Sequence, residues 1–311
     1  MMTPDFQTRR REELYGLLGI LPARDLPVTC RTVAVEEHED FILERLVLDV
    51  HSGMAENPRG EVIPALFSRP KTEGPYPAVL FCHSHGGQYF KGKDELLHPS
   101  PYMYQECYAA ALAKKGIAAL AIDHWCFGER SGRTELSTFK SMLWHGEVMW
   151  GRMVYDSLKA MDYLLARPDV DAGRVGTLGM SMGSTMAWWV AALDERAKLC
   201  VDICCLTDYA EIEKEDGLDR HGVYYYVPGL CLHFTSAQIN SLIAPRPHLG
   251  TVGKYDALTP KLGVDRIEAE LKAVYGDMGA EENISILRYP AGHLESAAMR
   301  ADILAFLDKH L

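Results

Sequence analysis

Residues 174–185 read Arg-Val-Gly-Thr-Leu-Gly-Met-Ser-Met-Gly-Ser-Thr, and this stretch decides the fold. Residues 175–178 are apolar enough for a buried strand, and the apolar run 186–193 predicts a buried helix soon after it. A Gly-x-Ser-x-Gly pattern centred on Ser181 occupies the corner between them. A serine lifted out of a strand end has a strained backbone, and glycines two residues away on each side prevent collisions. The stretch predicts a nucleophile elbow; an ordinary strand-to-helix turn of small residues is the alternative.

The composition indicates a globular protein of enzyme size. The chain has 311 residues, of which 48% are hydrophobic and 24% charged, and its formal net charge of -11 disfavours a nucleic-acid partner. No apolar run is long enough for a membrane span or a signal peptide. The eight cysteines lack paired metal-ligand spacing, which favours reduced thiols in the cytoplasm.

The remaining pattern predicts a single domain built on one sheet. Residues 30–69 are typical of antiparallel strands, and from residue 76 onward strands alternate with helices, as in a parallel sheet. We therefore expect a mostly parallel central sheet with antiparallel N-terminal strands and helices on both faces. The expected additions to this domain are a helical extension over about 1–29 and a lid-like insertion over about 206–242, whose mobility stays open.

Two loops offer the partners that a serine nucleophile needs. A serine hydroxyl requires a base within hydrogen-bond reach and a carboxylate that orients the base. Asp256 and His293 each lie just beyond a predicted strand, and the order Ser181, Asp256, His293 is the one this arrangement demands. Taken alone, Asp256 would serve equally well to close a turn. Asp202 and Asp208 are the alternative acids.

Stabilisation of an oxyanion requires two further N–H groups. We expect one from the backbone of Met182, directly after the serine, and one from His85 in the loop 83–87, with Gly86 as the alternative. The His-x-His pattern in this loop, together with His124, also suits a metal. No carboxylate lies at a convincing spacing, so we predict no metal site and a structural role for His83.

Four motifs together resemble the α/β-hydrolase superfamily, in the branch of dienelactone hydrolases and acetyl xylan esterases. They are the Gly-x-Ser-x-Gly at 179–183, the histidine and glycine loop at 83–87, Asp-x-x-x-x-Gly-Glu-Arg at 123–130 and Ala-Pro-Arg-Pro at 244–247. The resemblance implies an α/β-hydrolase fold and a cofactor-free serine hydrolase that cleaves esters through an acyl-enzyme. In it Ser181 is the nucleophile, His293 the base and then the acid, and Asp256 the orienting acid. Dienelactone hydrolases themselves use a cysteine, so Ser181 favours ordinary carboxylic esters.

Loops over the serine would set the specificity, and the expected partner is a small or medium ester. The main candidate substrate contacts are Trp125, Glu129, Trp144, His145 and Tyr225. Further candidates are Phe127, Arg130, His221, Tyr224, Tyr226 and Phe234. Packing of the insertion is the alternative role for the aromatic side chains. A peptidase or amidase of the same fold and a non-catalytic binding protein are the competing functions, and self-association is left open.

Overall fold

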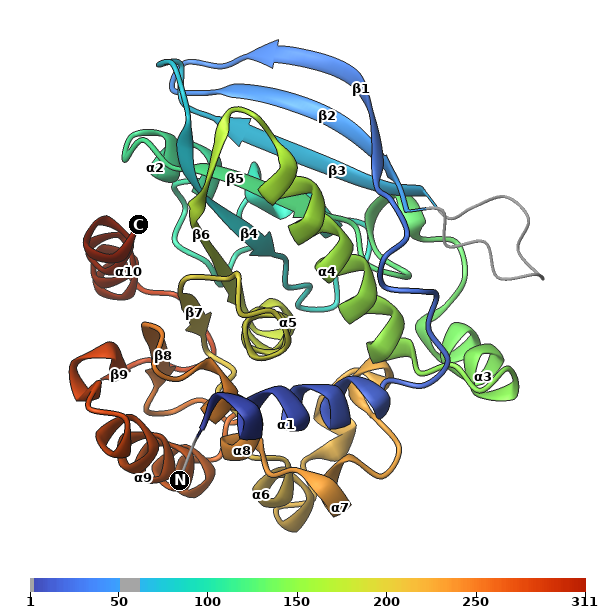
Figure 1. Ribbon diagram of the computed structural model, residues 1–311, viewed down its shortest axis with the longest axis vertical. Coiled ribbons are helices and arrows are strands. Elements are labelled where there is room, and N and C mark those ends of the chain that lie inside the picture. The colour runs from blue at the N-terminus through green and yellow to red at the C-terminus, as the bar shows by residue number, and fades with distance from the viewer. Residues whose placement is uncertain (1–2, 51–61) are drawn as a thin grey trace.

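The computed structural model describes residues 3–50 and 62–311, and in this part of the chain a nine-stranded sheet forms the centre (Figure 1). The strand order is β1-β2-β3-β5-β4-β6-β7-β8-β9. The strands are β1 Thr29–Glu37, β2 Ile42–Asp49, β3 Val62–Arg69, β4 Tyr76–Cys82, β5 Ala118–Ile122, β6 Val170–Met180, β7 Cys200–Ile203, β8 His248–Gly253 and β9 Ile284–Tyr289.

The first strands of this sheet are antiparallel and the rest are parallel. Antiparallel pairing joins β1 to β2, β2 to β3 and β3 to β5, whereas every pair from β5–β4 through β8–β9 is parallel. The predicted fold class is therefore confirmed. Parallel pairing brings the carboxyl ends of β4, β6, β7, β8 and β9 to one edge, where a site can gather side chains from distant parts of the chain.

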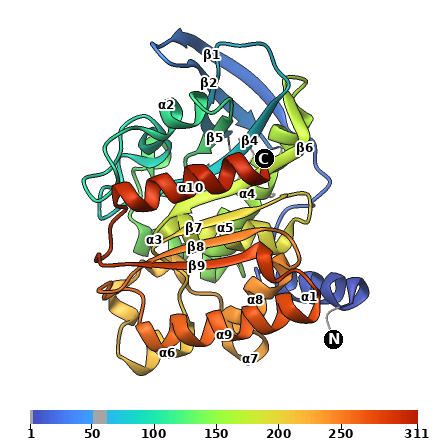
Figure 2. The same ribbon diagram turned by 90° about the vertical axis from the view of Figure 1, so that its left-hand side faces the viewer.

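Helices cover both faces of the sheet. On one face α2 Tyr108–Ala113 and α10 Ala297–His310 bury their apolar side chains, and on the other α4 Met149–Ala166 and α5 Met182–Leu193 do so (Figures 1 and 2). A smaller apolar cluster lies under α9 Lys261–Asp277. The other helices are α1 Pro4–Gly16, α3 Glu135–Trp144, α6 Tyr209–Lys214, α7 Leu230–His233 and α8 Ser236–Asn240. Short 3-10 turns are η1 Gly92–Leu96, η2 Gly128–Arg130, η3 Leu218–Arg220, η4 Val223–Tyr225, η5 Ser241–Ile243 and η6 Glu281–Asn283.

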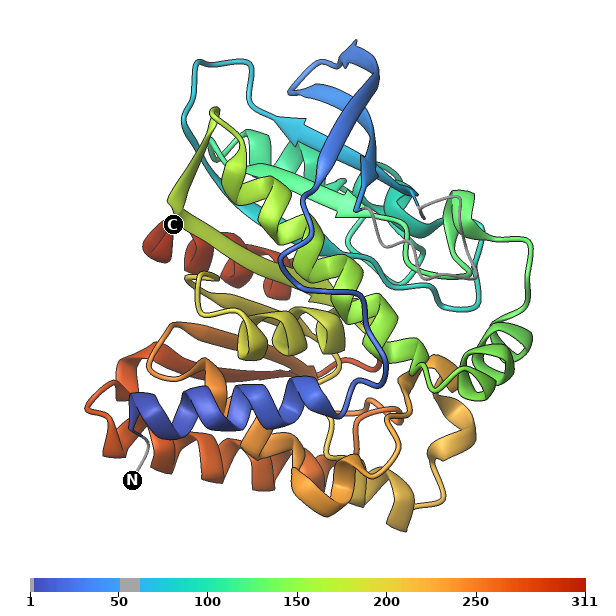
Figure 3. The same cartoon turned by 45° about the vertical axis from the view of Figure 1, so that its right-hand side comes forward.

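Two segments differ from their sequence pattern. The sequence of residues 101–115 predicts one helix, whereas the structure confines the helix to α2, because contacts with Glu295 hold the preceding residues in turns. The Glu295 N–H donates to Tyr102 O (2.8 Å), and the Glu295 carboxylate accepts from Tyr104 N–H (3.2 Å). The polar stretch before α4 contains α3, which projects from the body of the molecule (Figure 3). Within the range 30–69 the apolar pattern of residues 61–68 predicts one strand, and its first residue, Glu61, lies outside the described residues.

The N-terminal helix packs beside α5. Arg11 on α1 donates from Nε to Ala192 O (3.0 Å) and from Nη2 to Leu242 O (2.9 Å). From α1 the chain crosses α4 before it enters β1 (Figure 3). The division into an extension, a domain and an insertion stays a prediction. Within the described residues, no helix combines the length and apolar character needed to span a membrane.

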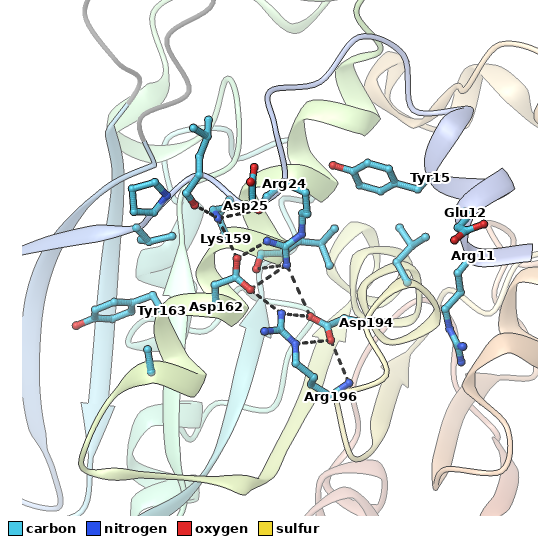
Figure 4. Close-up of a pocket in the computed structure, with 16 residues that line it drawn as sticks. Arg11, Glu12, Tyr15, Arg24, Asp25, Lys159, Asp162, Tyr163, Asp194 and Arg196 are labelled. Carbon is cyan, nitrogen blue, oxygen red and sulfur yellow. Dashed lines mark hydrogen bonds and ion pairs between the residues drawn. The ribbon is translucent and has the colours of Figure 1, made fainter. Parts of the chain in front are cut away.

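A charge network fastens this crossing segment to the domain (Figure 4). Arg24 Nη2 donates to Asp162 Oδ1 on α4 (2.9 Å), and Lys159 Nζ lies 3.0 Å from the same carboxylate. Arg196 donates to Asp162 (2.6 Å) and to Asp194 beyond α5 (2.6 Å). Burial alone would raise the pKa of Asp162, but hydrogen bonds from Arg24, Arg196 and Lys159 hold it well below its ordinary value.

Candidate active site

The elbow at Ser181 has the geometry that its sequence requires. Ser181 lies between β6 and α5 with φ 55° and ψ -119°, a conformation that side-chain-bearing residues rarely adopt. A Cβ on Gly179 would lie 2.1 Å from Gly183 O, and a Cβ on Gly183 would lie 1.9 Å from Cys82 O. Both glycines are therefore needed where the elbow presses against β4.

A continuous hydrogen-bonded chain links Ser181, His293 and Asp256. His293, after β9, places Nε2 2.8 Å from Ser181 Oγ and Nδ1 2.8 Å from Asp256 Oδ2. Asp256, in the turn after β8, has a fully buried side chain and also accepts the Leu258 N–H at 2.9 Å. The sequence prediction named these three residues, and parallel pairing of β6, β8 and β9 brings their loops together. Such a chain can draw the proton from the serine hydroxyl.

The alternative acids have other partners. Asp202 accepts a 2.6 Å hydrogen bond from His248 Nε2, and both side chains are fully buried within the sheet. Asp208 caps the start of α6 and binds Arg266 Nη1 at 3.0 Å. The carboxylate hydrogen-bonded to His293 is that of Asp256.

Glu295 holds the loop that carries His293, and sequence reasoning missed it. Its buried carboxylate receives two hydrogen bonds from Arg300 (2.7 and 2.8 Å) and one from Tyr108 OH (2.5 Å). Because Arg300 lies on α10 and Tyr108 on α2, these bonds tie the base loop to two helices. A glutamate two residues after the predicted base was the only signal in the sequence.

A second buried carboxylate, Glu95, organises the loop after β4. Glu95 is 1% exposed and accepts from the backbone N–H of Ser84 (2.6 Å), from Ser84 Oγ (2.7 Å) and from Ser100 Oγ (2.5 Å). The loop turns at Gly86, whose φ is +50° and where a Cβ would lie 2.3 Å from the Tyr102 ring. These contacts hold residues 85–87 beside the serine. Sequence reasoning did not find Glu95 or Tyr102.

The two predicted oxyanion donors border the same cavity as Ser181, which both His85 and Met182 line. Met182 is the first residue of α5, so its N–H has no acceptor within the helix. The helix dipole also favours negative charge at this end. The positions of both residues suit the stabilisation of an oxyanion formed at the serine.

Histidine rings brace the loop after β4. His83 donates from Nδ1 to Ser84 O (2.8 Å) and accepts the His124 N–H at Nε2 (3.3 Å). His85 accepts the Gly87 N–H at Nδ1 (3.0 Å) and therefore donates from Nε2 to Tyr224 OH (2.8 Å). Burial lowers the pKa of His85 to about 4, so its ring is neutral at pH 7. Among residues 3–50 and 62–311, no group of three or more His, Cys, Asp or Glu side chains could hold a metal ion.

The serine opens into a cavity of about 230 Å³. Its walls include residues from the segment 206–242 and from neighbouring loops: Tyr102, Arg220, His221, Tyr224, Tyr225 and Leu258. The ring of His221 stacks on that of Tyr225, with ring centroids 5.4 Å apart. The cavity therefore combines aromatic walls with a few polar groups, as small-molecule sites do.

Of the five main substrate contacts expected from sequence, Tyr225 lines this cavity and four do not. Trp125 packs beneath the guanidinium groups of two arginines, 4.5 and 5.6 Å from its ring. Glu129 binds Lys93 Nζ at 2.6 Å.

The other two lie at the end of α3. Trp144 is 91% exposed, and the adjacent His145 is bonded to Ser141 O (2.8 Å). The physical reason is that α3, whose last residue is Trp144, projects from the body of the molecule (Figure 3), and neither side chain lines the serine cavity. Among the further candidates, His221 and Tyr224 line the cavity.

Strand order, elbow and loop positions define an α/β-hydrolase, and the predicted resemblance to that superfamily is confirmed. The chain belongs to the X-Pro dipeptidyl-peptidase (S15) family, whose model matches residues 60–242. It is 50% identical over 306 residues to "Putative hydrolase YtaP" of Bacillus subtilis (strain 168), covering 98% of this chain and 100% of that protein. The chain is thus a hydrolase.

Solved structures that share its fold include two bacterial esterases. A "putative acetyl xylan esterase" from Bacteroides fragilis NCTC 9343 has a TM-score of 0.70 at 20% identity, covering 92% of this chain and 74% of that one. A glucuronoyl esterase from Solibacter usitatus has a TM-score of 0.71 at 16% identity, covering 100% and 94%. At these identities the likeness is one of fold.

Proposed function

We propose that this protein hydrolyses carboxylic esters of small or medium size through an acyl-enzyme on Ser181. The observation that carries the proposal is the hydrogen-bonded chain Ser181–His293–Asp256, with both bonds at 2.8 Å. Ser181 and His293 line a cavity that His85 and Met182 also line. These groups supply a nucleophile, a base, an orienting carboxylate and two oxyanion donors.

Acylation follows from this geometry. His293 Nε2 accepts the hydroxyl proton as Ser181 Oγ attacks the ester carbonyl carbon, and the backbone N–H groups of Met182 and His85 stabilise the charge on the former carbonyl oxygen. The buried carboxylate of Asp256 stabilises the imidazolium. His293 then gives its proton to the departing alcohol oxygen, and the acyl group stays on Ser181.

Deacylation repeats these steps with water. His293 accepts a proton from a water molecule while the water oxygen attacks the carbonyl carbon of the acyl-enzyme. The N–H groups of Met182 and His85 stabilise the second tetrahedral intermediate. Collapse of this intermediate breaks the bond to Ser181 Oγ, which recovers its proton from His293. The net products are a carboxylic acid and an alcohol.

The volume of the cavity and the names of two proteins with the same fold support an ester substrate. A cavity of about 230 Å³ suits a short acyl group, and two proteins of the same fold are named esterases. The family name raises a peptidase as the second candidate, since an X-Pro dipeptidyl-peptidase cleaves an amide bond. A cytoplasmic location is also proposed, supported by the eight cysteines, which are all free thiols.

The test is covalent labelling by an uncharged fluorophosphonate, read by intact mass, on the native protein and on Ser181→Ala. Ser184→Ala is the matched control, because Ser184 lies three residues further along and is fully buried. Labelling should vanish only in Ser181→Ala. p-Nitrophenyl esters from acetate to octanoate, set against Ala-Pro p-nitroanilide, then separate an esterase from a dipeptidyl-peptidase. Failure of the folded native protein to react with the label would exclude the proposal.

A further inference from the structure

One formal charge outside the triad borders the serine cavity at neutral pH. Of the described residues that line it, Arg220 is a permanent cation, and none is an aspartate or glutamate. His85 is neutral at pH 7, and burial likewise lowers the pKa of His221 below its ordinary value. An anionic part of a substrate would therefore meet a cation there, with no lining carboxylate to repel it.

The guanidinium of Arg220 is bound to a neutral acceptor. Its Nη1 donates to Ala257 O at 3.3 Å, and within the described part of the chain no carboxylate lies within ion-pair distance of it. Its sequence neighbour Asp219 is on the same short turn, η3, and does not line the cavity. By contrast, Arg266 on α9 binds both Asp208 and Glu211 at 3.0 Å. Arg220 thus keeps donors available for a carboxylate.

The backbone contact of Arg220 places it beside the acid loop. Ala257, whose carbonyl it binds, directly follows Asp256, and Leu258 of the same loop lines the cavity. The predicted oxyanion donors come from different segments, the loop after β4 and the start of α5. A group bound by Arg220 would therefore be held beside the loop that carries Asp256, apart from the carbonyl oxygen of the scissile ester.

We propose that Arg220 is a specificity residue that selects esters bearing a carboxylate close to the scissile bond. The proposal rests on the ester hydrolysis proposed above and names its substrate class. A guanidinium matches a carboxylate with two parallel hydrogen bonds. Because Arg220 is partly in water, the expected preference is on the order of tenfold in kcat/KM, toward the lower end for charge-assisted hydrogen bonds. A substrate with a protonated α-amino group would be disfavoured at this position.

The test compares matched ester pairs that differ in charge. On the acyl side the pair is mono-p-nitrophenyl succinate and p-nitrophenyl butyrate; on the alcohol side it is 4-acetoxybenzoate and 4-acetoxybenzamide. We expect the anionic member of at least one pair to be favoured about tenfold, mainly through KM, and Arg220→Gln to abolish this preference while activity on the neutral member persists. Arg220→Lys should keep part of it, because the charge remains without the planar fork.

Arg133→Gln is the control for loss of one positive charge, because Arg133 is exposed and lies outside the lining of the serine cavity. It should leave the anionic preference intact. Equal kcat/KM for both members of both pairs would overturn the role of Arg220, and so would a preference that survives in Arg220→Gln. Fluorophosphonate labelling and butyrate hydrolysis report on the proposed ester hydrolysis independently. Their persistence alongside a missing anionic preference would refute the inference about Arg220 alone.

Discussion

Replacement of Gly183 by alanine should disable the elbow without removing a reacting group. The added Cβ would lie 1.9 Å from Cys82 O, 2.6 Å from Cys82 C and 2.8 Å from His83 O, all backbone atoms at the end of β4. A contact to oxygen of even 3.0 Å requires α5 and β4 to separate by about 1.1 Å at this point. Backbone cannot rotate away as a flexible side chain could.

That separation acts on both stability and catalysis. Overpacking of this kind costs about 1–3 kcal/mol. At roughly 2.1 cal/mol/K of unfolding entropy per residue, a chain of 311 residues loses about 1.5 °C of Tm per kcal/mol, so Tm should fall by about 2–5 °C. Because Ser181 and Met182 precede Gly183 and the predicted oxyanion loop follows Cys82, the donors and the nucleophile would shift relative to each other. A misplacement near 1 Å costs on the order of 100-fold in rate.

Thermal unfolding and kcat/KM on p-nitrophenyl acetate measure the two effects. Gly16→Ala is the matched control, because its added Cβ would have nothing within 4 Å. A Gly183→Ala protein with the Tm and kcat/KM of the native protein would refute the reasoning that the elbow depends on close backbone approach.

Three further predictions concern the site and its scaffold. Ser181→Ala and His293→Ala should each lower kcat by a similar factor, about 10⁴–10⁶, and the double variant should lose little more, because triad members act as a unit; additive losses in single-turnover assays would contradict this. Glu95→Gln should lower kcat by about tenfold with a smaller change in KM, because an amide cannot accept every hydrogen bond that now holds Ser84 and the oxyanion loop; an unchanged kcat would argue against this role. Asp162→Asn should lower Tm at pH 7, and the difference in Tm from the native protein should narrow progressively as the pH falls below 3.8, the ordinary pKa of an aspartate. The reason is that a carboxyl whose pKa is depressed in the folded state stabilises the fold fully above its ordinary pKa and loses that effect as the pH falls toward its folded-state pKa. A Tm gap that is constant between pH 3 and pH 7 would exclude the role of this carboxylate.

The chemical groups of the site were largely readable from short patterns. Gly179 and Gly183 are needed for the backbone turn at Ser181, so the spacing of these residues alone predicts the turn. Asp256 and His293 were predictable because a parallel sheet gathers the residues that follow its strands at one edge. The fold class was predictable for a related reason, since the alternation of strands and helices reflects which faces are buried.

The specificity residues were much less predictable. Trp144 and Trp125 are aromatic and come from loops that were expected to lie over the serine, but α3 carries the first into solvent and two arginines cover the second. Arg220 and Tyr102 line the cavity, although nothing in their sequence neighbourhoods marks them. Aromatic character and sequence proximity do not specify the direction in which a loop folds.

Local conformation and the alternation of strands and helices thus follow from nearest-neighbour sterics and the periodicity of apolar residues, which are properties of the linear chain. The walls of the cavity and the buried carboxylates that brace it depend on contacts between segments up to about 190 residues apart, such as Tyr108 with Glu295. These contacts exist only after the sheet has assembled, because the desolvation of a carboxylate such as Glu295 is offset only when its partners from α2 and α10 reach it together. The nucleophile can therefore be identified from the five-residue pattern at 179–183, whereas the cavity walls and the buried carboxylates around it depend on tertiary packing.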